Sequence, residues 1–304
     1  MAVKDIFLAA LIIMVWGFNF VVIKFGVEDI PPLFLACLRF IAVAFPAIFF
    51  IRRPHVPFKL ICLYGMSLCF GQFALLFLSI HLGMPAGLAS LILQAQAFFT
   101  LILGAIFLSE KIQLHHFLGI LVAACGIFIL ADAKAANAAQ TSVPLVPLLL
   151  LLAAAFSWAI GNISNKIILK NYQVETLSLV AWSALIPILP FFICSWLFEG
   201  ETAITQSLLH FQLRDFLVVF YLAGVASLIG YGLWGYLLNK YETWKVAPLT
   251  LLVPVVGILT ASSVLGEHLS PQQFMGAFVI ILGLCINVFG MKIIQRLKPK
   301  FHSL

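Results

Sequence analysis

Ten apolar runs, each long enough to cross a lipid bilayer as a helix, occupy almost the whole of this 304-residue chain. A membrane-spanning helix needs about 20 predominantly apolar residues. Hydrophobic residues make up 63% of the chain and charged residues only 9%, whereas a soluble domain is about half apolar and a quarter charged. The sequence therefore excludes a soluble fold, a secreted disulfide scaffold and a nucleic-acid-binding protein.

The apolar runs are predicted to be helices rather than barrel strands. They are too long for transmembrane strands and lack the alternation of apolar and polar residues that barrels show. The first run has no cleavage site of small residues, so we expect it to be kept as a span rather than removed as a signal peptide. The expected spans are 5–24, 33–51, 58–80, 84–108, 115–131, 146–168, 176–197, 216–238, 245–265 and 272–291.

Lysine and arginine residues gather at alternate ends of the expected spans. With ten spans both termini lie on one side, and thirteen of the seventeen Lys and Arg residues fall on that side, against three on the other. The seventeenth, Arg39, lies within a span. Because Lys and Arg are enriched in cytoplasmic loops, both termini are expected to lie in the cytoplasm.

The two halves of the sequence match each other. Trp16 and Lys24 recur as Trp158 and Lys166 at a spacing of 142 residues. At a spacing of 157 the matches are Tyr64 with Tyr221, Glu110 with Glu267, Phe117 with Phe274, Gly119 with Gly276, and Gly126 with Gly283. Each half has five expected spans, and five is odd, so the second half crosses the membrane in the opposite sense. Such inverted repeats are typical of secondary transporters.

The sequence thus predicts an all-α integral membrane protein with ten transmembrane helices in two inverted five-helix repeats. The expected repeats are 1–140 and 141–292, followed by a basic cytoplasmic tail at 293–304. One pair of repeats can enclose a site by itself, so a monomer is expected. No motif of a nucleotide-binding loop, zinc protease or serine hydrolase is present, and the cysteines lack metal-ligand spacing. We expect no catalytic residues, no cofactor and no metal, with a small-molecule substrate and the lipid bilayer as partners.

Polar and aromatic side chains at membrane depth mark a candidate cavity. A polar group in hydrocarbon costs free energy unless it has a partner or faces water. Many of these residues share helix faces, since they lie three, four or seven positions apart. The candidates to line a substrate cavity are Trp16, Asn19, Gln72, Gln94, Gln96, Trp158, Asn162, Asn165, Tyr231 and Trp234. The alternative for each is a hydrogen bond between helices.

Arg39 is the strongest single candidate for binding a charged group. It is a permanent cation in the second expected span. Buried and unpaired it would be costly, so it needs a carboxylate, carbonyl groups, water or a bound anion. The alternative is that its side chain reaches the headgroups, because at 1.5 Å per residue it lies only about 9 Å from the start of the span.

Two glutamates and two prolines mark the ends and bends of spans. Glu110 and Glu267 lie at equivalent helix ends, where each is expected to pair with a cation or to cap the next helix. Pro248 is predicted to open the ninth span and Pro254 to interrupt and kink it, since proline removes a backbone hydrogen bond. Ala97 stands at the position equivalent to Pro254, so the two halves are expected to differ in this kink.

The chain resembles the EamA branch of the drug/metabolite transporter superfamily over its whole length. The motifs that carry the resemblance are the sequence VWGFNF at 15–20, Arg39-Phe40, and the span endings at 108–110 and 265–267. Longer stretches add to it at 84–90, 93–100, 153–158, 182–187, 241–244 and 246–249. The resemblance implies a ten-helix exporter in the inner membrane of a bacterium that works by alternating access. It also implies export of small amino-acid-type metabolites, O-acetylserine and cysteine among them.

From the residues alone, more than one substrate class stays open. A zwitterionic metabolite needs an anion-binding donor and neutral polar groups, available from Arg39, Gln94, Asn162 and Tyr231. A bulky aromatic or drug-like compound would stack on aromatic walls, here Trp16, Trp158, Tyr231 and Trp234. A membrane-embedded enzyme or structural subunit is a third hypothesis, and it is disfavoured because the chain lacks a paired acid–base or metal constellation.

Overall fold

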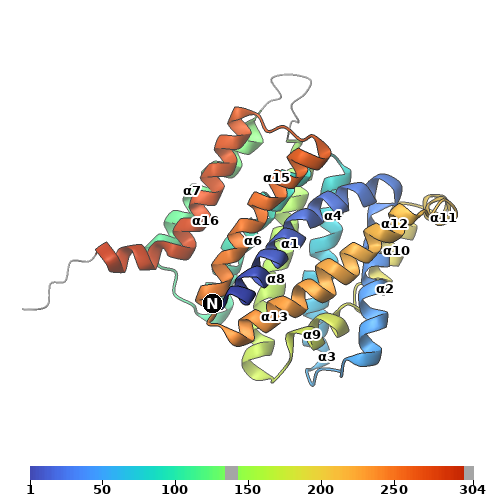
Figure 1. Cartoon of the computed structure of the whole chain (residues 1–304), viewed down its shortest axis with the longest axis horizontal. Coiled ribbons are helices and arrows are strands. Elements are labelled where there is room, and N and C mark those ends of the chain that lie inside the picture. Colours follow the sequence, from blue (N-terminus) through green and yellow to red (C-terminus); the bar gives the residue numbers. More distant parts are fainter. Residues whose placement is uncertain (134–142, 298–304) are drawn as a thin grey trace, which may run out of the picture.

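The computed structural model describes residues 1–133 and 143–297, which form a helical bundle (Figure 1). Within those residues, ten helical segments are long and apolar enough to cross a membrane. The ten predicted spans are therefore confirmed, and their ends shift by a few residues. The expected boundary between the repeats at 140 and most of the expected tail at 293–304 lie outside the described residues.

The first half begins with two long helices and continues with two spans that are not uniformly α-helical. Pro32 is the first residue of its helix, where a missing N–H costs nothing. The segments are α1 (Val3–Asp29), α2 (Pro32–Phe50), α3 (Phe58–Tyr64), η1 (Gly65–Gly71), α4 (Gln72–His81), α5 (Ala86–Ile92), η2 (Leu93–Ala95), α6 (Gln96–Leu108) and α7 (Leu114–Asp132).

The second half repeats this order and adds a short helix in its longest connection. That helix, α11, fills the region between the seventh and eighth spans that the sequence shows only as a longer break. The segments are α8 (Leu145–Asn171), α9 (Thr176–Ser183), α10 (Ile188–Phe198), α11 (Glu201–Leu209), α12 (Leu213–Phe220), η3 (Tyr221–Ile229), α13 (Gly230–Lys240), α14 (Thr243–Val246), η4 (Ala247–Leu252), α15 (Val253–Leu265) and α16 (Pro271–Leu297).

Irregular helical turns recur at equivalent positions of the two halves. The π-helical segment η1 in the third span has its counterpart in η3 of the eighth. A 3-10 segment precedes both α6 and α15. Both helices end in a residue with a left-handed backbone, Ser109 with φ 54° and Gly266 with φ 66°. The repeat therefore extends from side-chain identities to the local geometry of the backbone.

Pro254 does not interrupt a continuous α-helix, which corrects the kink predicted from the sequence. It lies in the first turn of α15, where proline disturbs no intrahelical hydrogen bond. The break is the 3-10 segment η4 in front of it, and Pro248 lies in the first turn of that segment. The first half makes the same kind of break at η2 without a proline. The prediction that only the second half is bent at this point is therefore wrong.

Hydrogen bonds from small and aromatic side chains to backbone carbonyls join the two halves. Ser79 Oγ donates to Pro147 O at 2.7 Å, and Ser157 Oγ donates to Ser67 O at 2.8 Å. Such groups find no other partner at membrane depth, where water is absent. The two halves therefore hold each other by bonds that connect the third span with the sixth.

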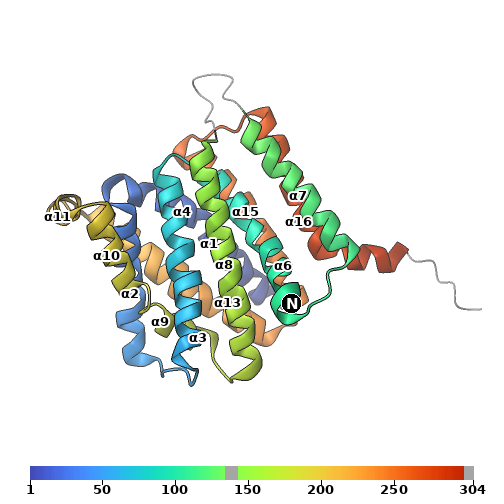
Figure 2. The ribbon, with the colours of Figure 1, turned by 180° about the vertical axis from the view of Figure 1, so that it is seen from behind.

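The fifth and tenth spans form a pair beside the rest of the bundle, and both views show α7 and α16 side by side (Figure 2). Glycines let their backbones approach closely, as small residues do in membrane helix pairs. A Cβ atom added to Gly283 would lie 2.7 Å from both Ala123 N and Gly119 O. A Cβ added to Gly126 would lie 2.8 Å from Gly276 O.

We predict that Gly283→Ala destabilises the protein. Its methyl group would meet backbone that cannot move aside, and overpacking of this kind costs about 1–3 kcal/mol. The matched control is Gly232→Ala, because a Cβ at Gly232 meets nothing within 4 Å. Thermal unfolding in detergent checks this, and equal melting temperatures for the two variants would contradict the close contact between α7 and α16.

Candidate functional site

A cavity of about 140 Å³ lies where the two halves meet. Its lining residues are Trp16, Asn19, Phe20, Arg39, Gln72, Phe73, Leu76, Ser90, Leu93, Gln94, Gln96, Trp158, Ala226, Tyr231, Thr250 and Val253. Several occupy equivalent positions of the repeat: Trp16 with Trp158, Leu93 with Thr250, and Gln96 with Val253. Inverted-repeat transporters bind their substrates at such an interface between repeats.

Arg39 is buried in the wall of this cavity, with only 3% of its surface exposed. Its Nη2 donates to Ser227 Oγ at 3.0 Å, and its guanidinium carbon lies 4.1 Å from the centre of the Phe73 ring. Within residues 1–133 and 143–297, Nε and Nη1 have no hydrogen-bond partner. Among the described residues no carboxylate forms an ion pair with Arg39. Of the two alternatives raised by the sequence, the structure shows burial rather than a side chain extended to the interface.

The depth of Arg39 follows from how α2 is anchored. Glu199, at the end of α10, accepts hydrogen bonds from the backbone N–H groups of Leu33 at 2.7 Å and Phe34 at 3.2 Å. A carboxylate at a helix N-terminus satisfies unpaired N–H groups and the helix dipole. Arg39 follows less than two turns later on this fixed helix, so its guanidinium enters the bundle rather than the headgroup region.

Aromatic rings and one amide also line the cavity. Trp16 packs against Tyr231 with 5.4 Å between ring centroids, and its Nε1 donates to Ala226 O at 3.0 Å. Asn19, one turn further along α1, is 8% exposed, and its Oδ1 has no hydrogen-bond partner. The cavity therefore holds unsatisfied donors at Arg39 and an unsatisfied acceptor at Asn19.

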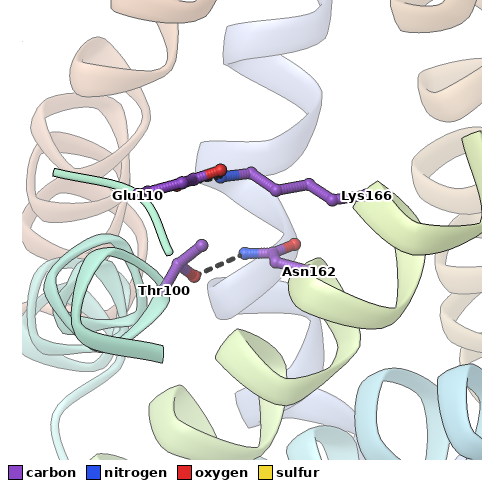
Figure 3. A network of polar contacts seen from close by, with 4 residues as sticks. All are labelled: Thr100, Glu110, Asn162 and Lys166. Carbon is purple, nitrogen blue, oxygen red and sulfur yellow. Dashed lines mark hydrogen bonds and ion pairs between the residues drawn. The ribbon is translucent and has the colours of Figure 1, made fainter. Parts of the chain in front are cut away.

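A polar network joins α6 to α8 beside the cavity (Figure 3). Asn162 Nδ2 donates to Gln96 Oε1 at 2.7 Å and to Thr100 Oγ1 at 3.0 Å. One turn further, Lys166 Nζ forms an ion pair with Glu110 Oε2 at 3.1 Å. Glu110 thus pairs with a cation, and Glu267 caps α5 by accepting from its N-terminal N–H groups. The expectation is confirmed for Glu110, whereas Glu267 caps α5 of the first half rather than α16, the helix that follows it.

The structure brings together most of the sequence-predicted site residues, but not all. Those in the cavity wall are Trp16, Asn19, Arg39, Gln72, Gln94, Gln96, Trp158 and Tyr231. Asn162, Asn165 and Trp234 are not among the lining residues. The amide of Asn162 is taken up by Gln96 and Thr100, Asn165 lies one turn beyond it, and Trp234 packs on Trp16 with 5.4 Å between centroids. Pro248 and Pro254 also lie outside the wall.

Thr250 and Val253 line the cavity and were not among the candidates. Val253 is apolar, and Thr250 lies near the end of a span, so neither residue stands out by type. The repeat carries the missing signal. Adding its spacing of 157 to Gln96 gives Val253, and adding it to Leu93 gives Thr250.

A larger hollow of about 1070 Å³ lies at one end of the bundle, between the α1–α2 turn and the α11–α12 region. Its charged groups satisfy one another, because Arg214 pairs with Glu28 at 3.1 Å and with Asp29 at 3.0 Å. Glu199 in its wall is engaged in capping α2. The smaller central cavity, with its unsatisfied donors and acceptor, is therefore the better candidate site.

Comparison with known proteins relates the whole chain to membrane transporters. The EamA-like transporter family matches residues 3–131 and 145–289. A protein named "Probable amino-acid metabolite efflux pump" from Salmonella typhimurium is 54% identical over 96% of this chain and 97% of its own length. A protein of the same name from Escherichia coli is 51% identical over the same shares. A crystal structure at 17% identity aligns with a TM-score of 0.66 over 98% of this chain and 99% of its own, and this likeness shows the fold alone.

We predict that Arg39→Met stabilises the substrate-free protein. Replacing buried charged groups by apolar ones of similar size has gained about 1–4 kcal/mol, and Ser227 keeps its hydrogen bond to Leu222 O. Thermal unfolding in detergent without substrate measures the effect. A lower melting temperature for the variant would show that Arg39 is held by interactions that the described contacts do not include.

Proposed function

The chain belongs to the EamA-like transporter family, and from this premise we propose that it exports small amino-acid-type metabolites by alternating access. The observation that carries the proposal is Arg39, a buried cation that has no carboxylate partner among the described residues and lines a cavity between inverted halves. A bound carboxylate would supply the missing charge and the acceptors for Nε and Nη1. The names of the two relatives that share about half of its residues support the same substrate class.

The size of the cavity supports small substrates over bulky ones. Its volume is about 140 Å³, close to that of an engineered apolar cavity of about 150 Å³ that binds benzene. Cysteine is close to benzene in size and O-acetylserine is somewhat larger than cysteine, so a cavity of this volume supports substrates of their size. Tryptophan is about twice as large as cysteine. We therefore favour O-acetylserine and cysteine, and we keep aromatic amino acids and drug-like compounds as the alternative.

The direction of the chain in the membrane is part of the proposal. The excess of Lys and Arg on the side of the termini supports a cytoplasmic location for both ends. Residues from both halves of a single chain line the cavity, which supports a monomer as the working unit. With this orientation, the Glu110–Lys166 ion pair lies at the cytoplasmic end of the bundle and Glu267 at the outer end.

Counterflow in proteoliposomes tests the function. Vesicles loaded with unlabelled cysteine or O-acetylserine are expected to take up the labelled compound in a saturable way, because a carrier exchanges substrate across its alternating site. Arg39→Met should reduce this exchange at least about tenfold, the loss that follows from removing a hydrogen-bonded charge. The control variant Gly232→Ala should exchange at the wild-type rate.

Two outcomes would contradict the proposal. Wild-type vesicles that exchange tryptophan but neither cysteine nor O-acetylserine would favour the aromatic alternative. Full exchange of cysteine by Arg39→Met would show that this residue does not hold the substrate carboxylate.

A further inference from the structure

We propose that Asn19 accepts the ammonium group of the substrate and that Asn19 and Arg39 together select zwitterions. This inference rests on the proposed function and deepens it by assigning the second charged end of the substrate. Asn19 and Arg39 line the same cavity and are more than nine-tenths buried. Each carries an unpartnered buried polar atom, Oδ1 in Asn19 and Nε and Nη1 in Arg39.

The two sets of unpartnered atoms are complementary to the two ends of an amino acid. An arginine guanidinium only donates hydrogen bonds, so it matches a carboxylate. An amide oxygen only accepts, so it matches an ammonium group. A ligand with a carboxylate alone would leave Asn19 Oδ1 unsatisfied, and an amine alone would leave Arg39 without a counter-charge. A buried group left unpaired costs free energy, so a ligand with both ends is favoured over either one.

The aromatic residues around Asn19 fit the same assignment. Trp16 lies three residues before Asn19 on α1, hence on the same helix face, and both line the cavity. The face of an indole ring attracts cations. An ammonium group at Asn19 would therefore lie in a part of the cavity that Trp16 also lines, while Arg39 holds the carboxylate from α2.

Two small thiols test the assignment. Cysteine has both charged groups, and 3-mercaptopropionate lacks the ammonium group. Asn19→Leu keeps the size of the side chain and removes the acceptor. It is expected to raise the KM for cysteine about tenfold or more, the loss that accompanies a missing charged hydrogen bond. The KM for 3-mercaptopropionate should change little, so the preference of the wild type for cysteine should disappear.

Asn162→Leu is the matched control, because Asn162 does not line the cavity and its amide is bound to Gln96 and Thr100. It should change the KM values of both compounds by the same factor and keep their ratio. An unchanged ratio in Asn19→Leu would overturn the assignment of Asn19 alone. A wild-type protein that neither exchanges cysteine nor is stabilised by it against heat would overturn the proposed function and this inference together.

A separate observation carries a second inference: Lys24 and Lys166 are equivalent under the repeat, and so are Glu110 and Glu267. Only one of the two possible Lys–Glu pairs is formed. Lys166 contacts Glu110 at 3.1 Å, whereas Lys24 forms no ion pair among the described residues. Glu267 instead accepts from the N–H groups of Ala86 at 2.7 Å and Gly87 at 3.0 Å.

The geometry points to an exchange of these ion pairs between the two states of the transporter. In an inverted repeat, each half adopts in one state the arrangement that the other half has in the opposite state. The state in which Lys166 and Glu110 separate is thus the state in which Lys24 and Glu267 meet. Lys24 lies seven residues after Gly17, whose backbone contacts Val253 and Val256 of α15. The same face of α1 therefore carries Lys24 toward the helix that ends at Glu267.

Reversible cross-linking tests the exchange. Two double variants, Lys24→Cys with Glu267→Cys and Glu110→Cys with Lys166→Cys, are made in a background whose six native cysteines are replaced. A short bifunctional thiol reagent that a reductant releases is used, since ion-paired side chains hold their backbones too far apart for a disulfide. Each cross-link is expected to lower the exchange of O-acetylserine about tenfold or more, and the reductant should restore it; O-acetylserine is used because cysteine is a thiol that would itself cleave the cross-link. Any condition that shifts the protein toward one of its two states should raise the yield of one cross-link and lower the yield of the other.

The yields are read without any substrate, so the exchange of ion pairs is judged independently of what the protein carries. Cross-linking yields that change in opposite directions, in a protein that exchanges no amino acid, would support the exchange of ion pairs. They would at the same time contradict the proposal that amino acids are the substrate. Failure of the 24/267 pair to cross-link in a variant that still exchanges cysteine would overturn the exchange of ion pairs. Yields that rise together would overturn it as well.

Discussion

The hydrocarbon interior offers polar groups no water, and this constraint explains where almost every polar side chain of the protein lies. Ser79, Ser157 and Trp16 donate to backbone carbonyls of the opposite half. Asn162 is bound by two side chains of α6. Among the described residues, buried polar atoms without a partner occur in Asp5, Asn19, Arg39 and Ser183, and of these four residues only Asn19 and Arg39 line the central cavity.

Inverted symmetry organises the backbone, and a few side chains break it. α1 and α8 start 142 residues apart, and both are 27 residues long. The position equivalent to Asn162 is Phe20, and the positions equivalent to Gln96 and Thr100 are Val253 and Gly257. The polar link between α6 and α8 thus has an apolar counterpart between α15 and α1. The two halves share one architecture, yet the side-chain interactions that join α6 to α8 differ from those that join α15 to α1.

The sequence was sufficient for the fold because hydrophobic length, charge bias and internal repeat are all local or periodic signals. It was sufficient for the types of residue in the cavity, since polar groups at membrane depth are few. It could not decide the position of Arg39, because that depends on Glu199, which anchors α2 from a distant part of the chain. Asn162 and Asn165 do not line the cavity for a related reason: one helix face continues past the end of the cavity, and the periodicity does not say where the cavity ends.

The three-residue segment η2 gives the fourth span a mechanical property of its own. An α-helix turns by about 100° per residue and a 3-10 helix by about 120°. Rewinding Leu93–Ala95 into α-helical geometry would therefore rotate α6 against α5 by about 60° and shorten the span by about 1.5 Å. Gln96 and Thr100 would swing away from Asn162 while Ser90, on α5, kept its place. A torsional adjustment of one turn can thus reshape one wall of the cavity without tilting a whole helix through the bilayer.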